Sequence, residues 1–143
     1  LDDLIQNGVR VKFCGDVKSL SDSLYELCQD AEQRSSSGQK LLLNIALNYS
    51  GRWHIEHVFK KLLKDQDIKH IDSEMQQLFG SDPDLLIRTS GEYRISNFML
   101  WQIAYTELYF TNAYWPDFTK DEFIKAIRSY NQRNRRFGNV EYA

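Results

Sequence analysis

Residues 88–98, RTSGEYRISNF, concentrate side chains that can bind an anion. Arg88 and Arg94 flank a Ser-Gly turn and follow the apolar run DLLI. A guanidinium is a rigid fork of donors that matches phosphate oxygens, so two of them can hold a diphosphate. Ser96, expected at the start of a helix over 97–105, would add a hydroxyl and backbone amides. The spacing also permits an exposed turn whose arginines form salt bridges.

Two further groups of residues could carry chemistry. Glu107 begins the run ELYF. A carboxylate beside a diphosphate is repelled unless a cation lies between them, so a functional Glu107 implies Mg²⁺, whereas the alternative is an exposed strand-end glutamate. His54 and His57 in WHIEH can share a helix face. The sequence offers no evident third ligand, which favours a solvated helix start over a zinc site.

The chain ends in a basic stretch that contains aromatic side chains. Basic residues mixed with aromatic ones can indicate RNA binding. Arginines also suit the negative end of a helix dipole, and a glycine commonly follows such an end. We favour this second interpretation. The residues concerned are Arg128, Tyr130, Arg133, Arg135, Arg136, Phe137 and Gly138.

The pattern of apolar residues predicts an α/β fold with a mostly parallel sheet flanked by helices, because strands and helices alternate along the chain. In such sheets ligands bind beyond the carboxyl ends of the strands, which here are the loops 48–53 and 89–94. The run 40–48 is almost continuously apolar, so we expect it to be buried on both faces. Strands are predicted at 9–15, 40–48, 84–89 and 107–110. Helices are predicted within 19–34, at 53–63, 73–79 and 97–105, and after a capping box of Thr119 and Glu122.

Length and composition indicate one soluble globular domain of 143 residues, with 42% hydrophobic and 27% charged residues. The net charge of -2 excludes bulk attraction to polyanions, so an anion site must be local. Cys14 and Cys28 are expected to be buried free thiols in a reducing cytoplasm. The opening LDDLIQNG reads as the end of a helix, and we therefore expect a longer protein.

Several motifs together resemble the cis-prenyltransferase family, the undecaprenyl diphosphate synthases or isoprenyl transferases. The resemblance implies an undecaprenyl diphosphate synthase-like fold and Mg²⁺-dependent condensation of isopentenyl diphosphate onto an allylic diphosphate, usually farnesyl diphosphate. The product would be a lipid carrier with cis double bonds. It also implies a cytoplasmic homodimer with at most peripheral membrane contact. The motifs are DLLIRTSGEYRISNFMLWQIAYTELYF, WPDF, RRFG, NGVRVKFCGD and LNIALNYSGRW.

The resemblance assigns roles to single residues by their place in these motifs. Arg88, Arg94 and Ser96 correspond to residues that grip isopentenyl diphosphate, and Glu107 corresponds to the metal-associated glutamate. Two further elements of the family pattern have counterparts here. One is the C-terminal RxG element, which in the family reaches the partner subunit's active site, and the other is the NYSGRW segment, which has a supporting role. These further residues are Arg136 and Gly138 in the first, and Asn48 and Arg52 in the second.

The sequence also departs from the family pattern. Ser50 and His54 stand where the family has Gly and Asp. The MDGNGRW segment, which carries the family's metal-binding aspartate, does not occur, so none of the 143 residues receives a catalytic role. We expect the chain to be the C-terminal portion of a catalytic domain, inactive by itself. The alternative is a non-catalytic accessory subunit, but the presence of both Arg88 and Arg94 favours the enzyme.

Overall fold

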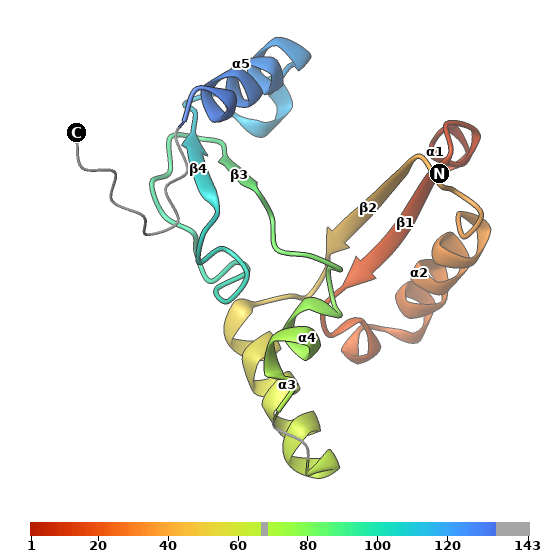
Figure 1. The fold of residues 1–143 in the computed structure, drawn as a ribbon. Coiled ribbons are helices and arrows are strands. Elements are labelled where there is room, and N and C mark those ends of the chain that lie inside the picture. Colours follow the sequence, from red (N-terminus) through yellow and green to blue (C-terminus); the bar gives the residue numbers. More distant parts are fainter. Residues whose placement is uncertain (67–68, 134–143) are drawn as a thin grey trace, which may run out of the picture. The chain divides into compact units, whose positions relative to one another are not determined.

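The computed structural model describes residues 1–66 and 69–133 (Figure 1). The chain divides into two compact units, Leu1–Gly80 and Ser81–Ala143. Each unit is built around one pair of parallel strands, so the predicted parallel pairing is confirmed. The expectation of a single domain stays a prediction.

Unit 1 is a parallel βαβ arrangement followed by two helices. Strands β1 and β2 pair in register from Val9 with Leu41 to Cys14 with Ala46. The crossover helix α2 packs on β1, as does the short α1. The elements of unit 1 are α1 (Asp2–Gln6), β1 (Val9–Cys14), the 3-10 turn η1 (Val17–Ser19), α2 (Asp22–Arg34), β2 (Leu41–Ala46), α3 (Gly51–Asp65) and α4 (Ile71–Gln76).

Strand β1 shows why the alternating sequence forms a half-buried strand. Val9 and Val11 are buried while Arg10 between them is exposed. Side chains of the α2 region satisfy backbone amides of this strand. Ser35 Oγ accepts from Val11 N at 3.0 Å, and Glu32 Oε1 accepts from Phe13 N at 2.7 Å. These bonds occupy donors that would otherwise be open to a strand from another chain.

Strand β2 forms where predicted, but its expected burial on both faces is wrong. Leu41 is 58% exposed and Leu42 is 46% exposed. The physical reason is that β2 belongs to a two-stranded sheet and pairs only with β1 among the described residues. An almost continuous apolar run therefore predicted the strand correctly without predicting what covers it.

Helices α3 and α4 are held together by their own small core. Val58, Leu62 and Met75 are buried, and Ile55 and Ile71 pack against them. The α3 residues in this set recur every three or four positions, which is the apolar stripe of an amphipathic helix.

Unit 2 pairs β3 (Leu85–Arg88) with β4 (Glu107–Phe110), in register from Leu85 with Glu107 to Arg88 with Phe110. After the 3-10 turn η2 (Trp115–Asp117) comes α5 (Lys120–Asn131), which packs on β4. Thr119 caps α5, because its Oγ1 accepts from the backbone N of Glu122 at 3.4 Å. The predicted cap and helix are confirmed.

The predicted helix over 97–105 is wrong, and so is the helix start expected at Ser96. This segment forms a series of turns. Ser96, Asn97 and Met99 have φ values of +47°, +61° and +47°. Left-handed residues cannot continue a right-handed helix, so the amphipathic spacing of the sequence is not realised as one.

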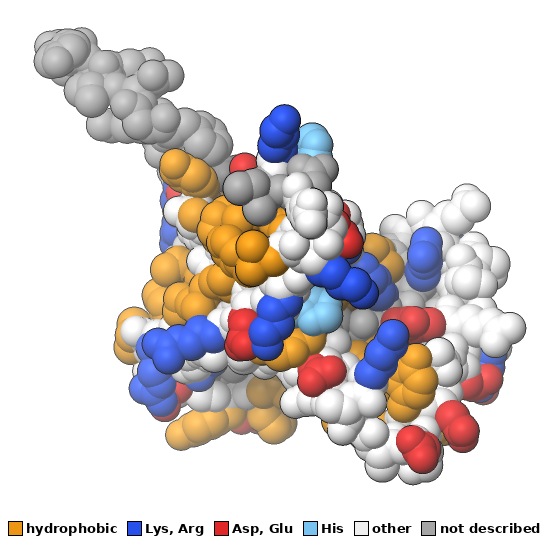
Figure 2. Space-filling model, turned by 90° about the horizontal axis from the view of Figure 1, so that it is seen from below, with side chains coloured by type: hydrophobic (Ala, Val, Ile, Leu, Met, Phe, Trp, Pro, Cys, Tyr) orange, Lys and Arg blue, Asp and Glu red, His pale blue; other side chains and the backbone are white. Residues whose placement is uncertain are grey.

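The distribution of surface charges and the burial of the two cysteines agree with what the composition predicts. On the face shown in Figure 2, basic and acidic side chains are interspersed, as a net charge of -2 suggests. Cys14 and Cys28 are free and buried, as predicted, and burial raises the pKa of both thiols. In the part of the chain that the structure describes, every helix is too short or too polar to cross a membrane.

Candidate functional site

A cavity of about 620 Å³ in unit 2 combines a polar stretch with apolar walls. Its polar lining comes from the consecutive residues Arg88, Thr89 and Ser90 at the carboxyl end of β3. This is the sheet edge at which parallel α/β proteins bind ligands. The apolar lining comes from Leu86, Ile87, Ile95, Phe98, Trp115, Phe118 and Phe123.

Backbone hydrogen bonds fix the polar stretch in place. Thr111 N donates to Arg88 O at 2.9 Å, and Ser90 N donates to Ala113 O at 2.8 Å. Gly91 N donates to Thr111 O at 2.9 Å. The segment after β4 thus continues the pairing beyond the end of β3, and it holds Ser90 and Gly91 in left-handed conformations with φ of +70° and +66°. Arg88 is therefore presented by a constrained backbone rather than by a free loop.

Arg94 and Ser96 lie in the same loop but do not line this cavity. The Arg94 side chain is 64% exposed and forms an ion pair with Glu92. Ser96 is exposed. The structure thus brings Arg88 to the cavity and keeps the other two predicted phosphate ligands on the loop surface. The salt-bridged turn expected as one alternative is present at Arg94, whereas anion binding at Arg88 stays a prediction.

Replacing Glu92 by Gln should strengthen diphosphate binding. Glu92 competes with any anion for Arg94, and an exposed ion pair contributes about 0.2–1 kcal/mol. Removing the competitor should lower the dissociation constant of inorganic diphosphate by roughly 1.5- to 5-fold in a calorimetric titration. Asp121→Gln is the matched control, because it removes an equal charge elsewhere in unit 2. An equal gain in this control would mean that only net charge matters.

Glu107 lies at the other end of the strand pair from Arg88. Glu107 opposes Leu85, and Arg88 follows Leu85 by three residues, or about 10 Å along the strand. Because side chains alternate, Arg88 and Glu107 also point to opposite faces of the pair. The described chain therefore does not bring the predicted metal ligand to the predicted phosphate ligand.

The surroundings of Glu107 do not fit a complete metal site. Arg133 Nη1 lies 2.6 Å from Glu107 Oε2, and Arg133 Nη2 donates to Leu108 O at 2.8 Å. Within residues 1–66 and 69–133, no three His, Cys, Asp or Glu side chains are grouped to hold an ion. A single carboxylate that is bound to a guanidinium is a poor cation site, so we derive no step through a metal. The same contacts engage Arg133, which the RNA interpretation would need free.

The other predicted site residues have different positions. In unit 1, Asn48 Nδ2 donates to Asp16 O at 3.0 Å and to Ser19 Oγ at 2.8 Å, which ties the loops after β1 and β2 together. Arg52 is exposed on the first turn of α3. Arg136 and Gly138 lie outside the described residues.

The two departures from the family pattern have structural roles in unit 1. Ser50 caps α3, since its Oγ accepts from Trp53 N at 3.2 Å. A serine just before a helix is a known capping signal, although we did not predict this one. His54 is only 2% exposed and packs edge-on against Tyr49 and Phe79. The expectation of a solvated pair is therefore wrong for His54, because its side of the helix faces these rings; His57 is exposed.

His54 should make unit 1 sensitive to acid. Burial lowers the pKa of His54, and His57 nearby lowers it further. In the unfolded chain the pKa returns to about 6.5, so below that pH the unfolded state binds more protons. The free energy of unfolding should then fall with decreasing pH by at most ~1.4 kcal/mol per pH unit.

Urea unfolding at pH 7.5 and 5.5 measures this dependence. His54→Gln should reduce the difference between the free energies of unfolding at the two pH values. A His54→Gln protein with the full pH dependence of the parent would show that other groups cause it.

Comparison with known proteins places these features in one family. The prenyltransferase family model, described as undecaprenyl diphosphate synthase, matches residues 1–138. A Legionella pneumophila (strain Paris) protein named ditrans,polycis-undecaprenyl-diphosphate synthase ((2E,6E)-farnesyl-diphosphate specific) is 45% identical over 98% of this chain and 63% of its own length. An Aquifex aeolicus isoprenyl transferase is 47% identical over 93% of this chain and 59% of its own length.

Solved structures agree with the sequence relatives. A Campylobacter jejuni crystal structure described as an undecaprenyl diphosphate synthase matches with a TM-score of 0.86 and 31% identity, over 96% of this chain and 69% of that one. Lavandulyl diphosphate synthase from Lavandula x intermedia, in complex with dimethylallyl diphosphate, matches with a TM-score of 0.84 and 32% identity, over 96% and 64%.

Nearly all of this chain is matched, but the chain spans only 63% of the length of the Legionella relative. The family match, the identity to these relatives and the shared fold confirm the resemblance that the sequence motifs indicated. The chain belongs to the undecaprenyl diphosphate synthase family of prenyltransferases.

Proposed function

We propose that the protein condenses isopentenyl diphosphate onto an allylic diphosphate with cis geometry, to make a polyprenyl diphosphate lipid carrier. The observation that carries this proposal is the unit 2 cavity, in which Arg88, Thr89 and Ser90 adjoin a wall of apolar side chains. A ligand that fits both parts has an anionic head and a short hydrocarbon tail. Isopentenyl diphosphate has this character, and farnesyl diphosphate is the allylic partner suggested by the name of the Legionella relative.

The residues of this cavity suit the chemistry. In the condensation, the alkene of isopentenyl diphosphate forms a bond to the allylic carbon as the bond from that carbon to the departing diphosphate breaks. The hydrocarbon cation that results then loses a proton from C2 of the isopentenyl unit to the released diphosphate, which forms the new double bond. Arg88 would hold the diphosphate of the nucleophile, and so would fix the alkene in a reactive position. Aromatic and aliphatic walls would exclude water from the developing cation. On the surface of the same loop, Arg94 and Ser96 would add contacts to the diphosphate when it binds.

Magnesium remains part of this proposal through the family resemblance. Glu107 is the candidate ligand in the described chain, and to serve as one it would have to exchange Arg133 for the ion. Because Glu107 is already paired with Arg133, an ion could bind to Glu107 only after Arg133 has moved away.

Assembly as a cytoplasmic homodimer, with at most peripheral membrane contact, is a further part of the proposal. The homodimer is supported by large aromatic side chains exposed in unit 2, such as Tyr105 at 78% and Tyr114 at 66%. Aromatic residues are enriched at the centres of protein interfaces. Sedimentation equilibrium should give twice the mass of one chain, and a Tyr114→Ser protein should sediment as a lighter species.

A condensation assay with the whole protein tests the proposed activity. Farnesyl diphosphate, labelled isopentenyl diphosphate and Mg²⁺ should yield longer prenyl diphosphates with newly formed cis double bonds. A protein that binds isopentenyl diphosphate without elongation, and gains activity only with a second, different subunit, would instead be the accessory subunit considered from the sequence.

A further inference from the structure

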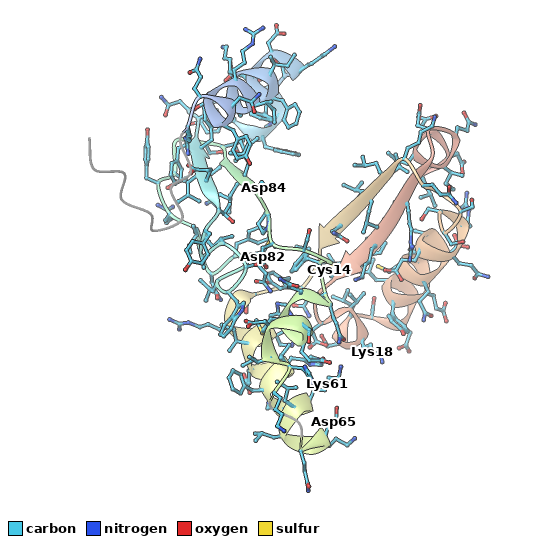
Figure 3. The ribbon with its side chains drawn as sticks, in the orientation of Figure 1. Cys14, Lys18, Lys61, Asp65, Asp82 and Asp84 are labelled. Atoms are coloured by element: carbon cyan, nitrogen blue, oxygen red, sulfur yellow. The ribbon has the colours of Figure 1, made fainter. Side chains whose placement is uncertain are left out.

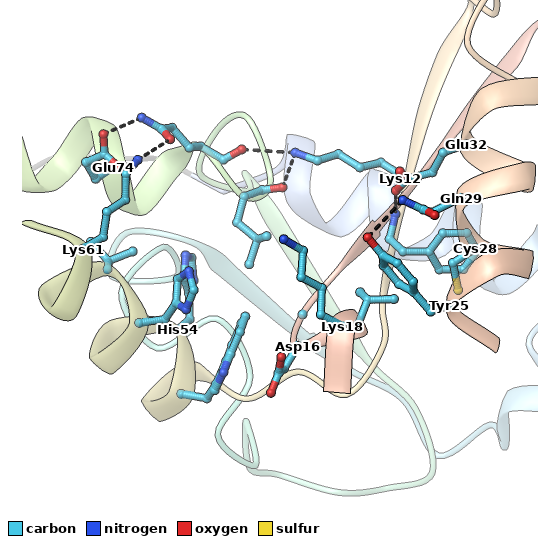
Figure 4. A pocket seen from close by; sticks show the side chains of 18 residues that line it. Lys12, Asp16, Lys18, Tyr25, Cys28, Gln29, Glu32, His54, Lys61 and Glu74 are labelled. Carbon is cyan, nitrogen blue, oxygen red and sulfur yellow. Dashed lines mark hydrogen bonds and ion pairs between the residues drawn. The ribbon is translucent and has the colours of Figure 1, made fainter. Parts of the chain in front are cut away.

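Unit 1 contains a second cavity, of about 460 Å³, and none of the residues assigned above to diphosphate binding lines it (Figure 4). Lining residues come from the end of β1, from η1, from α2 and from α3 and α4. Cys14 marks the carboxyl end of β1, and Lys18 follows on η1 (Figure 3). The cavity therefore lies beyond the carboxyl end of a parallel strand and beside the crossover helix, which is where α/β proteins place ligands.

Three lysines supply the cavity with unused hydrogen-bond donors. Lys12 Nζ donates to Leu78 O at 2.6 Å and to Gln77 O at 3.1 Å. Lys61 Nζ bonds to Glu74 Oε2 at 2.5 Å and to Gln77 Oε1 at 3.3 Å. An ammonium has three donors, so each of these keeps one. Lys18 keeps all three, because it has no partner among the described residues.

The lining holds as many carboxylates as lysines, so its formal charge is zero and only the local arrangement can favour an anion. Glu32 accepts from Phe13 N at 2.7 Å, and Glu74 accepts from both Lys61 and Gln77. Asp16 is the remaining carboxylate of the lining. In Figure 4 the Lys18 side chain extends away from Asp16 and toward the Lys12 side of the cavity. An acceptor-rich, negatively charged group on that side would satisfy the free donors.

Aromatic side chains on two helices give the cavity an apolar part. Trp53 on α3 stacks with His57, with ring centroids 5.2 Å apart and planes at 30°. Tyr25 lines the cavity from α2, and its hydroxyl accepts from Gln29 Nε2 at 3.0 Å. The volume of about 460 Å³ lies within the range of small-molecule sites. A ligand of this size could place a ring near Tyr25 or Trp53 while its anionic group reaches the lysines.

We propose that unit 1 carries a second ligand site, which binds a small organic phosphate through Lys12, Lys18 and Lys61 and packs its ring against aromatic side chains. Phosphate is the class of anion favoured here, because its several oxygens can accept from the free donors of more than one ammonium group at once. The site does not depend on the proposed function, since it shares no residue with the unit 2 cavity.

Calorimetric titration of the whole protein with phenyl phosphate, inorganic phosphate and phenol tests this site. Phenyl phosphate should bind more tightly than either of its parts. Lys18→Gln removes charge-assisted hydrogen bonds and should weaken phenyl phosphate binding by roughly 10- to 150-fold. Lys18→Arg keeps the charge and should retain most of the affinity. Lys64→Gln changes an exposed lysine of α3 that is not in the lining, and should have no effect.

Arg88→Ala separates this site from the proposed diphosphate site. Phenyl phosphate binding should be unchanged in Arg88→Ala, and saturating isopentenyl diphosphate should not displace it. The proposal is overturned if phenyl phosphate binds no more tightly than inorganic phosphate, or if Lys64→Gln weakens binding as much as Lys18→Gln. Loss of binding in Arg88→Ala, or displacement by isopentenyl diphosphate, would also overturn it by placing the ligand in unit 2.

Discussion

Replacing Arg88 by Ala in the whole protein should lower kcat/KM for isopentenyl diphosphate by roughly 10- to 150-fold, because each lost charge-assisted hydrogen bond costs about 1.5–3 kcal/mol. Arg88 is the guanidinium that lines the unit 2 cavity, and its backbone is held by Thr111. The KM for farnesyl diphosphate should change little. Steady-state kinetics with each substrate varied in turn measure both effects.

Two other arginines give this prediction its controls. Arg94→Ala should act in the same direction but more weakly, since Arg94 is exposed and already paired with Glu92. Arg128→Ala removes an exposed arginine from α5 and should change kcat/KM by no more than about twofold. Equal damage to the use of both substrates by Arg88→Ala would mean that Arg88 is structural and does not select isopentenyl diphosphate.

Replacing Gly15 by Ala should destabilise unit 1 by about 4 kcal/mol. Gly15 has φ of +145°, and an added Cβ would lie 2.0 Å from the carbonyl oxygen of Leu47. The two chain segments cannot separate easily, because Leu47 N donates to Cys14 O at 3.0 Å and Asp16 N to Asn48 O at 3.1 Å. The same close approach shapes one wall of the unit 1 cavity, which Gly15 lines.

Gly80→Ala is the matched control for this effect. Gly80 also has a left-handed φ, +94°, but an added Cβ there meets no described atom within 4 Å. Gly80→Ala should therefore lower the free energy of unfolding only by the backbone strain of the new residue, about 1 kcal/mol. Urea unfolding of both variants measures the difference. If the two substitutions lower the free energy of unfolding equally, the contact of Gly15 with Leu47 is not a determinant of stability.

The sequence predicted the elements whose signals are local. The cap at Thr119 and the alternation of β1 each depend on neighbours within a few residues, and both were confirmed, although the Glu122 side chain bonds to Lys125 and Thr111 instead of completing a capping box. The sequence also singled out the loop 88–98 for anion binding; Arg88 and its neighbours line a cavity, and the binding itself stays a prediction. In each case the residue types themselves carry the physical reason.

Features that depend on distant partners were not predicted. The helix expected over 97–105 fails because left-handed residues such as Asn97 interrupt an otherwise suitable spacing. The burial of His54 depends on Phe79, which is 25 residues away. The unit 1 cavity is lined by residues from Lys12 to Leu78, and no short sequence motif predicts that residues so far apart lie together. Sequence patterns describe one segment at a time, whereas these features arise when segments pack.

The central claim is that one cavity in unit 2 binds both parts of isopentenyl diphosphate. Calorimetric titration of the chain with isopentenyl diphosphate and, in parallel, with inorganic diphosphate tests it most directly. The ester should bind more tightly than inorganic diphosphate, Arg88→Ala should weaken both, and Phe98→Ala should weaken only the ester. Equal affinities for the two ligands, or an ester affinity that neither substitution changes, would contradict the claim.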